Sequence, residues 1–182
     1  MFKAVLDSKQ VLYLCPTTLL CNQQYEVALE RFKNYPVNIA VLNRFVSISE
    51  TNKVLKGLFD GSIDIVFCTH RGLSNDVVFS DLGLLVIDEE QRFGVAHKEK
   101  IKEIKSSVDV LTLTATPIPR TLQMAVLGIK NMSLIETPPK NRKSVATYVV
   151  PFDKKLVREI IYKEVGRGGQ VYILYNRVDD IE

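Results

Sequence analysis

The run Leu84-Leu85-Val86-Ile87-Asp88-Glu89-Glu90-Gln91 decides the fold, because four apolar residues are followed directly by three carboxylates. A short apolar run of this kind is typical of a buried strand in a parallel sheet. In an open α/β sheet, ligands gather at the carboxyl ends of the strands, so these acids stand where chemistry takes place. There, Asp88 can hold a magnesium ion that bridges nucleotide phosphates, and Glu89 can polarise an attacking water. The alternative is a strand that ends in a solvated acidic turn.

The segments around this run alternate between strand-like and helix-like patterns. Strands are expected at residues 11–15, 37–42, 63–68, 84–87 and 110–113, and helices at 18–33, from 49 to about 57–61, at 97–105 and from 119 onward. Thr18 and Ser49 are the expected N-caps of the first two helices. The alternation predicts an α/β fold with a parallel sheet covered by helices.

The sequence Thr-Pro-Pro-Lys-Asn-Arg-Lys at residues 137–143 interrupts this alternation and is typical of a linker. An extended segment (145–150), a helix (153–165) and a strand (170–175) are expected after it. One helix and one strand cannot bury a core, so we expect the chain to be an internal piece of a longer protein. The predicted division is a first lobe at 1–135, a hinge at 136–156, and the truncated start of a second lobe at 157–182.

Composition excludes several classes of protein. Of 182 residues, 46% are hydrophobic and 25% charged, as in an ordinary globular protein, and the net charge of +3 is too small to indicate a nucleic-acid partner by itself. Three cysteines without a C-x-x-C pair and only two histidines make a zinc site improbable. The absence of a disulfide framework, a signal peptide and a long apolar stretch predicts a cytoplasmic protein without a membrane partner.

Five motifs carry a resemblance to a known family. In order they are P-T-T-L-L (16–20), T-H-R-G-L (69–73), D-E-E-Q-R-F-G-V (88–95), T-A-T-P-I-P-R-T-L (114–122) and G-Q-V-Y-I-L-Y-N-R-V (169–178). They resemble motifs Ia, Ib, II, III and IV of superfamily 2 helicases and translocases. The long forms of motifs II and III resemble two branches, the bacterial transcription-repair coupling factors and the RecG-type fork-remodelling helicases. D-E-E-Q before H-K-E-K-I-K, together with N-R-F (43–45) and I-E-T-P-P (135–139), favours the coupling factors.

This resemblance implies a RecA-like first motor lobe that uses ATP and magnesium, followed by the start of a second RecA-like lobe. Asp88 would hold magnesium, Glu89 would orient the attacking water, and Glu90 and Gln91 would complete motif II. Gln91 replaces the histidine or aspartate common at its position, but an amide can still bridge to motif III; the alternative is a surface polar residue. Thr114, Ala115 and Thr116 would couple hydrolysis to DNA movement, unless they are ordinary strand-end residues.

The resemblance also implies a track for the DNA backbone. Hydroxyls, backbone N–H groups and an arginine suit phosphate oxygens and do not read bases. The residues concerned are Pro16, Thr17, Thr18, Thr69, His70 and Arg71, with Arg44 as a further candidate. The alternatives are N-capping for Thr18 and a solvated side chain for Arg71.

The chain contains no phosphate-binding loop, since none of its nine glycines is followed by lysine and then serine or threonine. By resemblance, that loop precedes residue 1, and the arginine finger and the modules for RNA polymerase and excision-repair proteins lie outside the sequence. The resemblance therefore implies an ATP-dependent double-stranded DNA translocase that displaces stalled RNA polymerase and couples transcription to nucleotide excision repair, with the fragment inactive alone. A RecG-type helicase and a non-enzymatic nucleic-acid-binding domain remain as alternatives.

Overall fold

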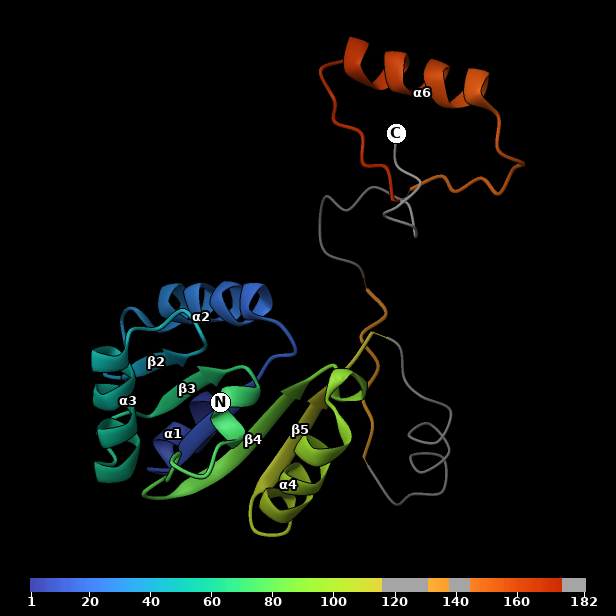
Figure 1. Cartoon of the computed structure of the whole chain (residues 1–182). Coiled ribbons are helices and arrows are strands. Elements are labelled where there is room, and N and C mark those ends of the chain that lie inside the picture. The colour runs from blue at the N-terminus through green and yellow to red at the C-terminus, as the bar shows by residue number, and fades with distance from the viewer. Residues whose placement is uncertain (116–130, 138–144, 175–182) are drawn as a thin grey trace. The chain divides into compact units, whose positions relative to one another are not determined.

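The computed structural model describes residues 1–115, 131–137 and 145–174 (Figure 1). It divides into two units, Met1–Met132 and Ser133–Glu182. The expected helix from residue 119, Thr116, most of the linker at 137–143 and the last residue of the expected strand at 170–175 lie outside the described residues.

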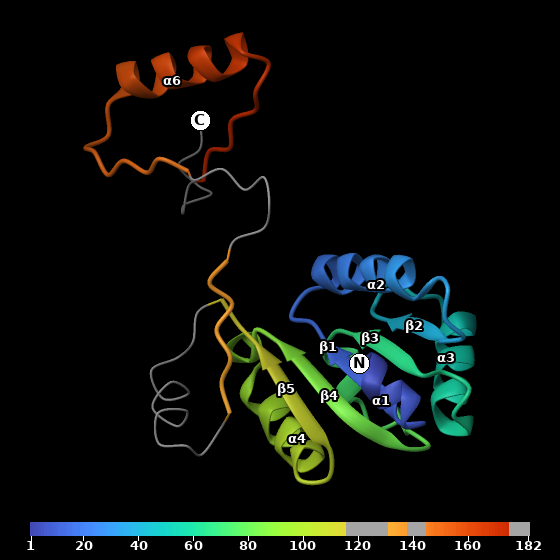
Figure 2. The ribbon, with the colours of Figure 1, turned by 180° about the vertical axis from the view of Figure 1, so that it is seen from behind.

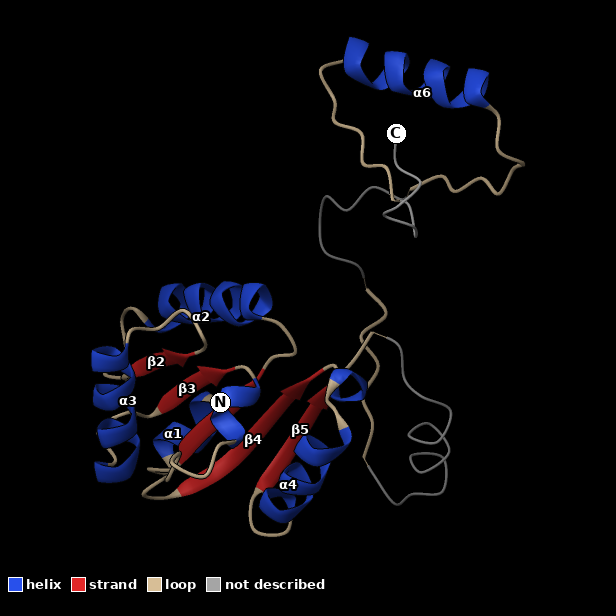
Figure 3. Ribbon diagram, in the orientation of Figure 1, coloured by secondary structure: helices blue, strands red, loops and turns tan. Residues whose placement is uncertain are grey.

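The first unit is built on a parallel five-stranded sheet (Figure 3). Its strands are β1 (Gln10–Leu14), β2 (Ile39–Leu42), β3 (Ile65–Cys68), β4 (Leu82–Asp88) and β5 (Asp109–Leu113). The order across the sheet is β2-β3-β1-β4-β5, and every neighbouring pair is parallel. The prediction of an α/β fold with a parallel sheet flanked by helices is therefore confirmed, although strand ends differ from the expected ones by one to two residues.

Two apolar cores lie on opposite faces of this sheet, because successive side chains of a strand point to opposite faces. Leu12 and Leu14 of β1 belong to one core, and Val11 and Tyr13 belong to the other. Helices α1 (Phe2–Leu6) and α2 (Thr18–Phe32) pack on the face of Val11, while α3 (Ile48–Asp60) and α4 (Val95–Lys105) pack on the face of Leu12. Figure 1 shows α4 in front of the sheet, and Figure 2, from behind, shows α1.

The helix starts differ from two of the predicted caps. The N-cap of α2 is Thr17, whose hydroxyl accepts a hydrogen bond from Leu20 N at 3.3 Å, and Thr18 is the first helical residue. The N-cap of α3 is Ser47, which accepts from Glu50 N at 3.2 Å, so the prediction of Ser49 was wrong. In each case an earlier hydroxyl residue has the extended backbone that an N-cap requires.

Strand β5 forms the edge of the sheet in the part of the chain that the structure describes. It pairs with β4 only, and its apolar side chains Val110, Leu111 and Leu113 are 36%, 48% and 37% exposed. The central strands β1 and β3 are completely buried by comparison. As far as the structure describes the chain, this edge beside motif III is therefore apolar and has no further strand.

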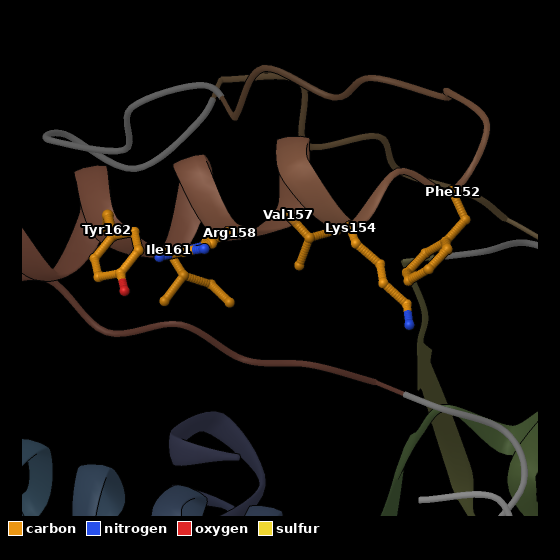
Figure 4. Close-up of a pocket in the computed structure, with 6 residues that line it drawn as sticks. All are labelled: Phe152, Lys154, Val157, Arg158, Ile161 and Tyr162. Atoms are coloured by element: carbon orange, nitrogen blue, oxygen red, sulfur yellow. The ribbon is translucent and has the colours of Figure 1, made fainter. Parts of the chain in front are cut away.

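The second unit contains one described helix, α6 (Lys154–Gly166), which is capped by the Asp153 carboxylate. Residues 170–174 form no strand, contrary to prediction, because a strand requires a hydrogen-bonded neighbour and none lies within the described residues. A cavity of about 430 Å³ lies along α6, and Figure 4 shows the six side chains that line it: Phe152, Lys154, Val157, Arg158, Ile161 and Tyr162. Among the helices of both units that the structure describes, none is long and apolar enough to cross a bilayer.

Candidate functional site

Four of the five predicted motifs converge on one edge of the first unit, because parallel strands end at the same edge; motif IV (169–178) belongs to the second unit and lies partly outside the described residues. Motif Ia follows β1, motif Ib follows β3, motif II follows β4 and motif III follows β5. Arg44 joins them from the turn after β2. Residues far apart in the sequence are therefore placed on one surface, on which two groups can be distinguished: an acidic group after β4 and β5, and a cavity after β1, β2 and β3.

Glu89 links motif II to motif III. Its backbone N donates to Leu113 O at 2.9 Å, and its carboxylate accepts from Ala115 N at 3.1 Å and from the Thr114 hydroxyl at 3.0 Å. The hydrogen bond from the Ala115 backbone is the main cause of a lowered pKa for Glu89, so its charged form is favoured. Glu89 also has φ 51° and ψ 55°, a left-handed backbone that is uncommon for a residue with a side chain.

Gln91 reinforces the same link. Its side-chain amide donates to the Glu89 carboxylate and, at 3.4 Å, to the Thr114 hydroxyl. The amide therefore lies between motifs II and III, where sequence interpretation places a bridge. Thr116, the other threonine of motif III, is outside the described residues.

Glu90 forms an ion pair and a hydrogen bond that the sequence analysis did not predict. Its carboxylate pairs with the Lys105 ammonium at 2.7 Å and accepts from the Thr112 hydroxyl at 3.5 Å. Lys105 is the last residue of α4, and Thr112 belongs to β5. The third acid of the motif therefore holds α4 and β5 to the motif II turn, and only the three-dimensional fold brings these residues together.

Asp88 ends β4 as a partly buried carboxylate. Burial raises its pKa, the charge of Glu89 raises it further, and Arg92 opposes the shift. No three His, Cys, Asp or Glu side chains gather as a metal cage among the described residues. A single carboxylate that completes its coordination with nucleotide phosphates and water suits magnesium, which seldom occupies an all-protein cage. Asp88 thus fits the metal role that the resemblance implies.

The seven residues predicted to contact DNA all line one cavity of about 330 Å³. They are Pro16, Thr17, Thr18, Arg44, Thr69, His70 and Arg71. The set includes two arginines and no acid, so the lining is suited to an anion. Because Thr17 caps α2, the cavity also adjoins the start of that helix, where backbone N–H groups favour negative charge.

Arg71 is held in place by Asp76. Two guanidinium nitrogens donate to the two carboxylate oxygens at 2.7 and 2.6 Å, an arrangement that lowers the pKa of Asp76 and raises that of Arg71. A Cβ on the neighbouring Gly72 would lie 2.6 Å from Cys68 Cβ, so only glycine lets this short helix, η1 (His70–Leu73), approach β3 so closely. The Arg71 side chain is 28% exposed and paired with Asp76, and its contact with DNA stays a prediction.

Helix α4 packs on η1 and so connects the two groups of residues. The rings of His70 and His97 lie 5.4 Å apart, and Lys100 donates to Asn75. His97 and Lys100 belong to the helix that directly follows motif II, whereas His70 lines the cavity. Sequence reasoning missed this contact because the two helices are separated by strand β4 in the chain.

The strand order, the motif II to motif III link and the cavity together define a helicase motor lobe. The DEAD/DEAH box helicase model matches residues 1–125, and the chain belongs to this family. Over its whole length the chain is similar to transcription-repair-coupling factors: it is 64% identical to that of Bacillus subtilis (strain 168) over 181 residues and 53% identical to that of Staphylococcus haemolyticus (strain JCSC1435) over 180 residues. These matches cover 100% and 99% of the chain but 15% of each relative, so the chain spans about one seventh of their length. The resemblance seen in the motifs is confirmed.

Solved structures agree on the fold. The structure of RecG bound to a three-way DNA junction matches 94% of this chain and 23% of the RecG chain, with a TM-score of 0.71 and 37% identity. The helicase MrfA matches 93% of this chain and 34% of its own, with a TM-score of 0.57 and 21% identity, which supports the fold alone. The RecA-like fold is therefore confirmed, and 37% identity to RecG against 64% to a coupling factor favours the latter branch.

Proposed function

We propose that this chain is part of an ATP-driven double-stranded DNA translocase of the transcription-repair-coupling type. The whole protein would move stalled RNA polymerase along DNA and bring excision-repair proteins to the site, through modules outside this sequence. It would act in the cytoplasm. Residues 1–135 would form most of the first motor lobe, 136–156 the hinge, and 157–182 the start of the second lobe.

One observation carries this proposal: the anion-suited cavity and the acidic group occupy the same edge of one sheet. A motor needs a nucleotide site and a DNA track on a common rigid support, so that a change at one reaches the other. Here α4 begins directly after the motif II turn and packs on η1, which carries two cavity residues. This contact between α4 and η1 supports coupling between the motif II acids and the proposed DNA track.

The chemistry follows from the roles of the two acids. ATP would supply the phosphoryl group, and magnesium bound at Asp88 would neutralise charge on its phosphates. Glu89 would accept a proton from the attacking water or orient it. Because Thr114 and Ala115 bind the same carboxylate, a change in its charge or position would alter motif III. In the proposal, Gln91 and Thr116 relay this change toward DNA.

Experiments on the intact protein distinguish this function from the two alternatives, a RecG-type helicase and a non-enzymatic nucleic-acid-binding domain. The intact protein should displace RNA polymerase stalled on DNA in the presence of ATP, and should do so better than it remodels a branched DNA fork. Fork remodelling without polymerase displacement would support the RecG-type alternative. Nucleic-acid binding with no ATP hydrolysis in the intact protein would support the non-enzymatic alternative.

We expect the 182-residue chain by itself to release no phosphate from ATP above background. It contains no phosphate-binding loop, so the acids at 88 and 89 would act on a substrate whose β- and γ-phosphates are not held. Phosphate release with and without duplex DNA measures this directly, and the Asp88→Ala variant provides the background. DNA-stimulated release well above that variant would contradict the expectation.

Arg71 and Asp76 should shift DNA affinity in opposite directions in the intact protein. Arg71→Ala removes a phosphate contact, so the plot of log affinity against log salt should flatten by about one unit. Asp76→Asn removes the carboxylate that binds two guanidinium nitrogens, so it should strengthen binding at low salt. Lys33→Ala, at the far end of α2, is the matched loss of one positive charge and should change the slope less. Equal slopes for the wild type and Arg71→Ala would assign Arg71 a purely structural role.

A further inference from the structure

We propose that Phe45 is a nucleic-acid contact whose ring binds the apolar face of a nucleotide, sugar or base, next to a phosphate in the cavity. The inference rests on the proposed DNA-binding function and adds a contact that does not depend on charge.

Phe45 is an exposed aromatic side chain beside a charged cavity. It is 71% exposed, whereas Phe67 and Phe93 of the same unit are 1% and 6% exposed. Single exposed apolar side chains are common on proteins, so the exposure of Phe45 is informative only together with its contact with Arg44, which lines the cavity. Phe59 is similarly exposed, at 67%, but lies in the last turn of α3, away from the residues that line the cavity.

The turn that presents the ring is fixed by hydrogen bonds. Asn43 is 5% exposed; its side-chain oxygen accepts from Phe45 N at 2.9 Å, and its amide donates to the Asn22 side chain at 2.9 Å. Val46 N donates to Asn43 O at 3.2 Å, which closes the turn. A backbone held in this way loses little conformational freedom when a ligand binds. The free energy gained from contact with the ring is therefore not spent on ordering the turn.

Arg44 contacts the Phe45 ring and also lines the cavity. Its guanidinium carbon lies 4.8 Å from the centroid of the Phe45 ring, and the same side chain lines the cavity with Thr17 and Arg71. Cationic groups beside an apolar ring match a chain in which phosphates alternate with sugars and bases. An acidic protein surface would satisfy the arginines but would not supply a flat apolar group at each repeat. We therefore assign the ring to nucleic acid.

The test compares the wild type and four variants of the intact protein on duplex DNA of arbitrary sequence, titrated over a range of salt concentrations. Phe45→Ala should weaken binding about 10- to 100-fold, as expected when the ligand no longer covers one aromatic side chain. Its salt slope should equal that of the wild type, because no phosphate contact is lost. Arg44→Ala should instead flatten the slope by about one unit. Phe45→Tyr keeps the ring and should bind like the wild type, and Phe59→Ala removes an equally exposed ring elsewhere and should also bind normally.

Three results would overturn the assignment. Unchanged affinity of Phe45→Ala would show that the ring makes no contact with DNA. A flattened slope for Phe45→Ala would show that it acts only by positioning Arg44. Normal DNA affinity with impaired binding to stalled polymerase would assign the ring to a protein partner. Failure of the wild type itself to bind DNA would instead contradict the proposed function. Equal thermal midpoints for Phe45→Ala and the wild type exclude misfolding as the cause of weaker binding.

Discussion

Replacing Glu89 by glutamine in the intact protein should lower the rate of ATP hydrolysis by about 10²- to 10⁴-fold, the usual loss when a positioned general base is removed. The amide keeps the length of the side chain, and its oxygen can still accept the hydrogen bond from Ala115 N. The Thr114 hydroxyl and the Gln91 amide, which both donate to the other oxygen of Glu89, can turn so that each accepts from the new NH2 group. The motif II turn should therefore keep its shape. What is lost is the negative charge that these neighbours favour in the native carboxylate.

The same variant should still bind ATP and magnesium, because Asp88 is unchanged. It should accumulate on DNA in an ATP-bound state and fail to displace stalled polymerase. Nucleotide affinity and single-turnover hydrolysis measured side by side separate binding from chemistry. Asp88→Asn is the matched comparison and should weaken magnesium-dependent nucleotide binding itself. Loss of ATP binding by Glu89→Gln, with normal turnover at saturating ATP, would reverse the two assigned roles.

Replacing Gln10 by alanine should reduce the free energy of unfolding by about 2–5 kcal/mol, a large part of the stability of a typical domain. Gln10 is 4% exposed, and its amide donates to Leu58 O at 3.0 Å and to Ile63 O at 2.8 Å. Its side-chain oxygen accepts from Asp81 N at 2.9 Å. One side chain therefore ties the start of β1 to the end of α3 and to the loop before β4, and its loss leaves buried backbone groups poorly satisfied.

Denaturant unfolding measures this loss, and Gln23→Ala is the control because it removes the same side chain from an exposed position on α2. Gln23→Ala should change stability by less than about 0.5 kcal/mol. A Gln10→Ala variant as stable as the Gln23→Ala variant would show that water or backbone movement replaces the three hydrogen bonds.

The sequence was sufficient to predict the parallel sheet and the location of the site, for a physical reason. Apolar runs such as Leu84 to Ile87 carry a strong signal for buried strands, and the residues after them must lie at one sheet edge. The cavity residues were therefore found together even though Thr17 and Arg71 are 54 positions apart. The family resemblance indicated which residues belong together, and the parallel sheet brings them close because its strands end at one edge.

The remaining features depend on geometry that no local pattern encodes. The Arg71–Asp76 pair needs the turn after β3, and the Glu90–Lys105 pair needs α4 to return its last residue to motif II. The caps were misplaced because Thr17 and Thr18, or Ser47 and Ser49, are equivalent by residue type and differ only in backbone conformation. Phe45 was missed because an exposed ring is recognised only when burial is known.

The open edge of β5 has a thermodynamic consequence for the first unit. Among the described residues, the backbone edge of β5 that faces away from β4 has no strand partner, and the partly exposed side chains of Val110, Leu111 and Leu113 form a surface on which another strand can add. Any segment that pairs there, from the same polypeptide or from a second copy, binds the folded form and not the unfolded one. The stability of this unit is thus linked to occupancy of one strand edge. An unfolding free energy measured for this unit therefore includes whatever segment pairs with that edge, and becomes concentration-dependent if copies pair through it.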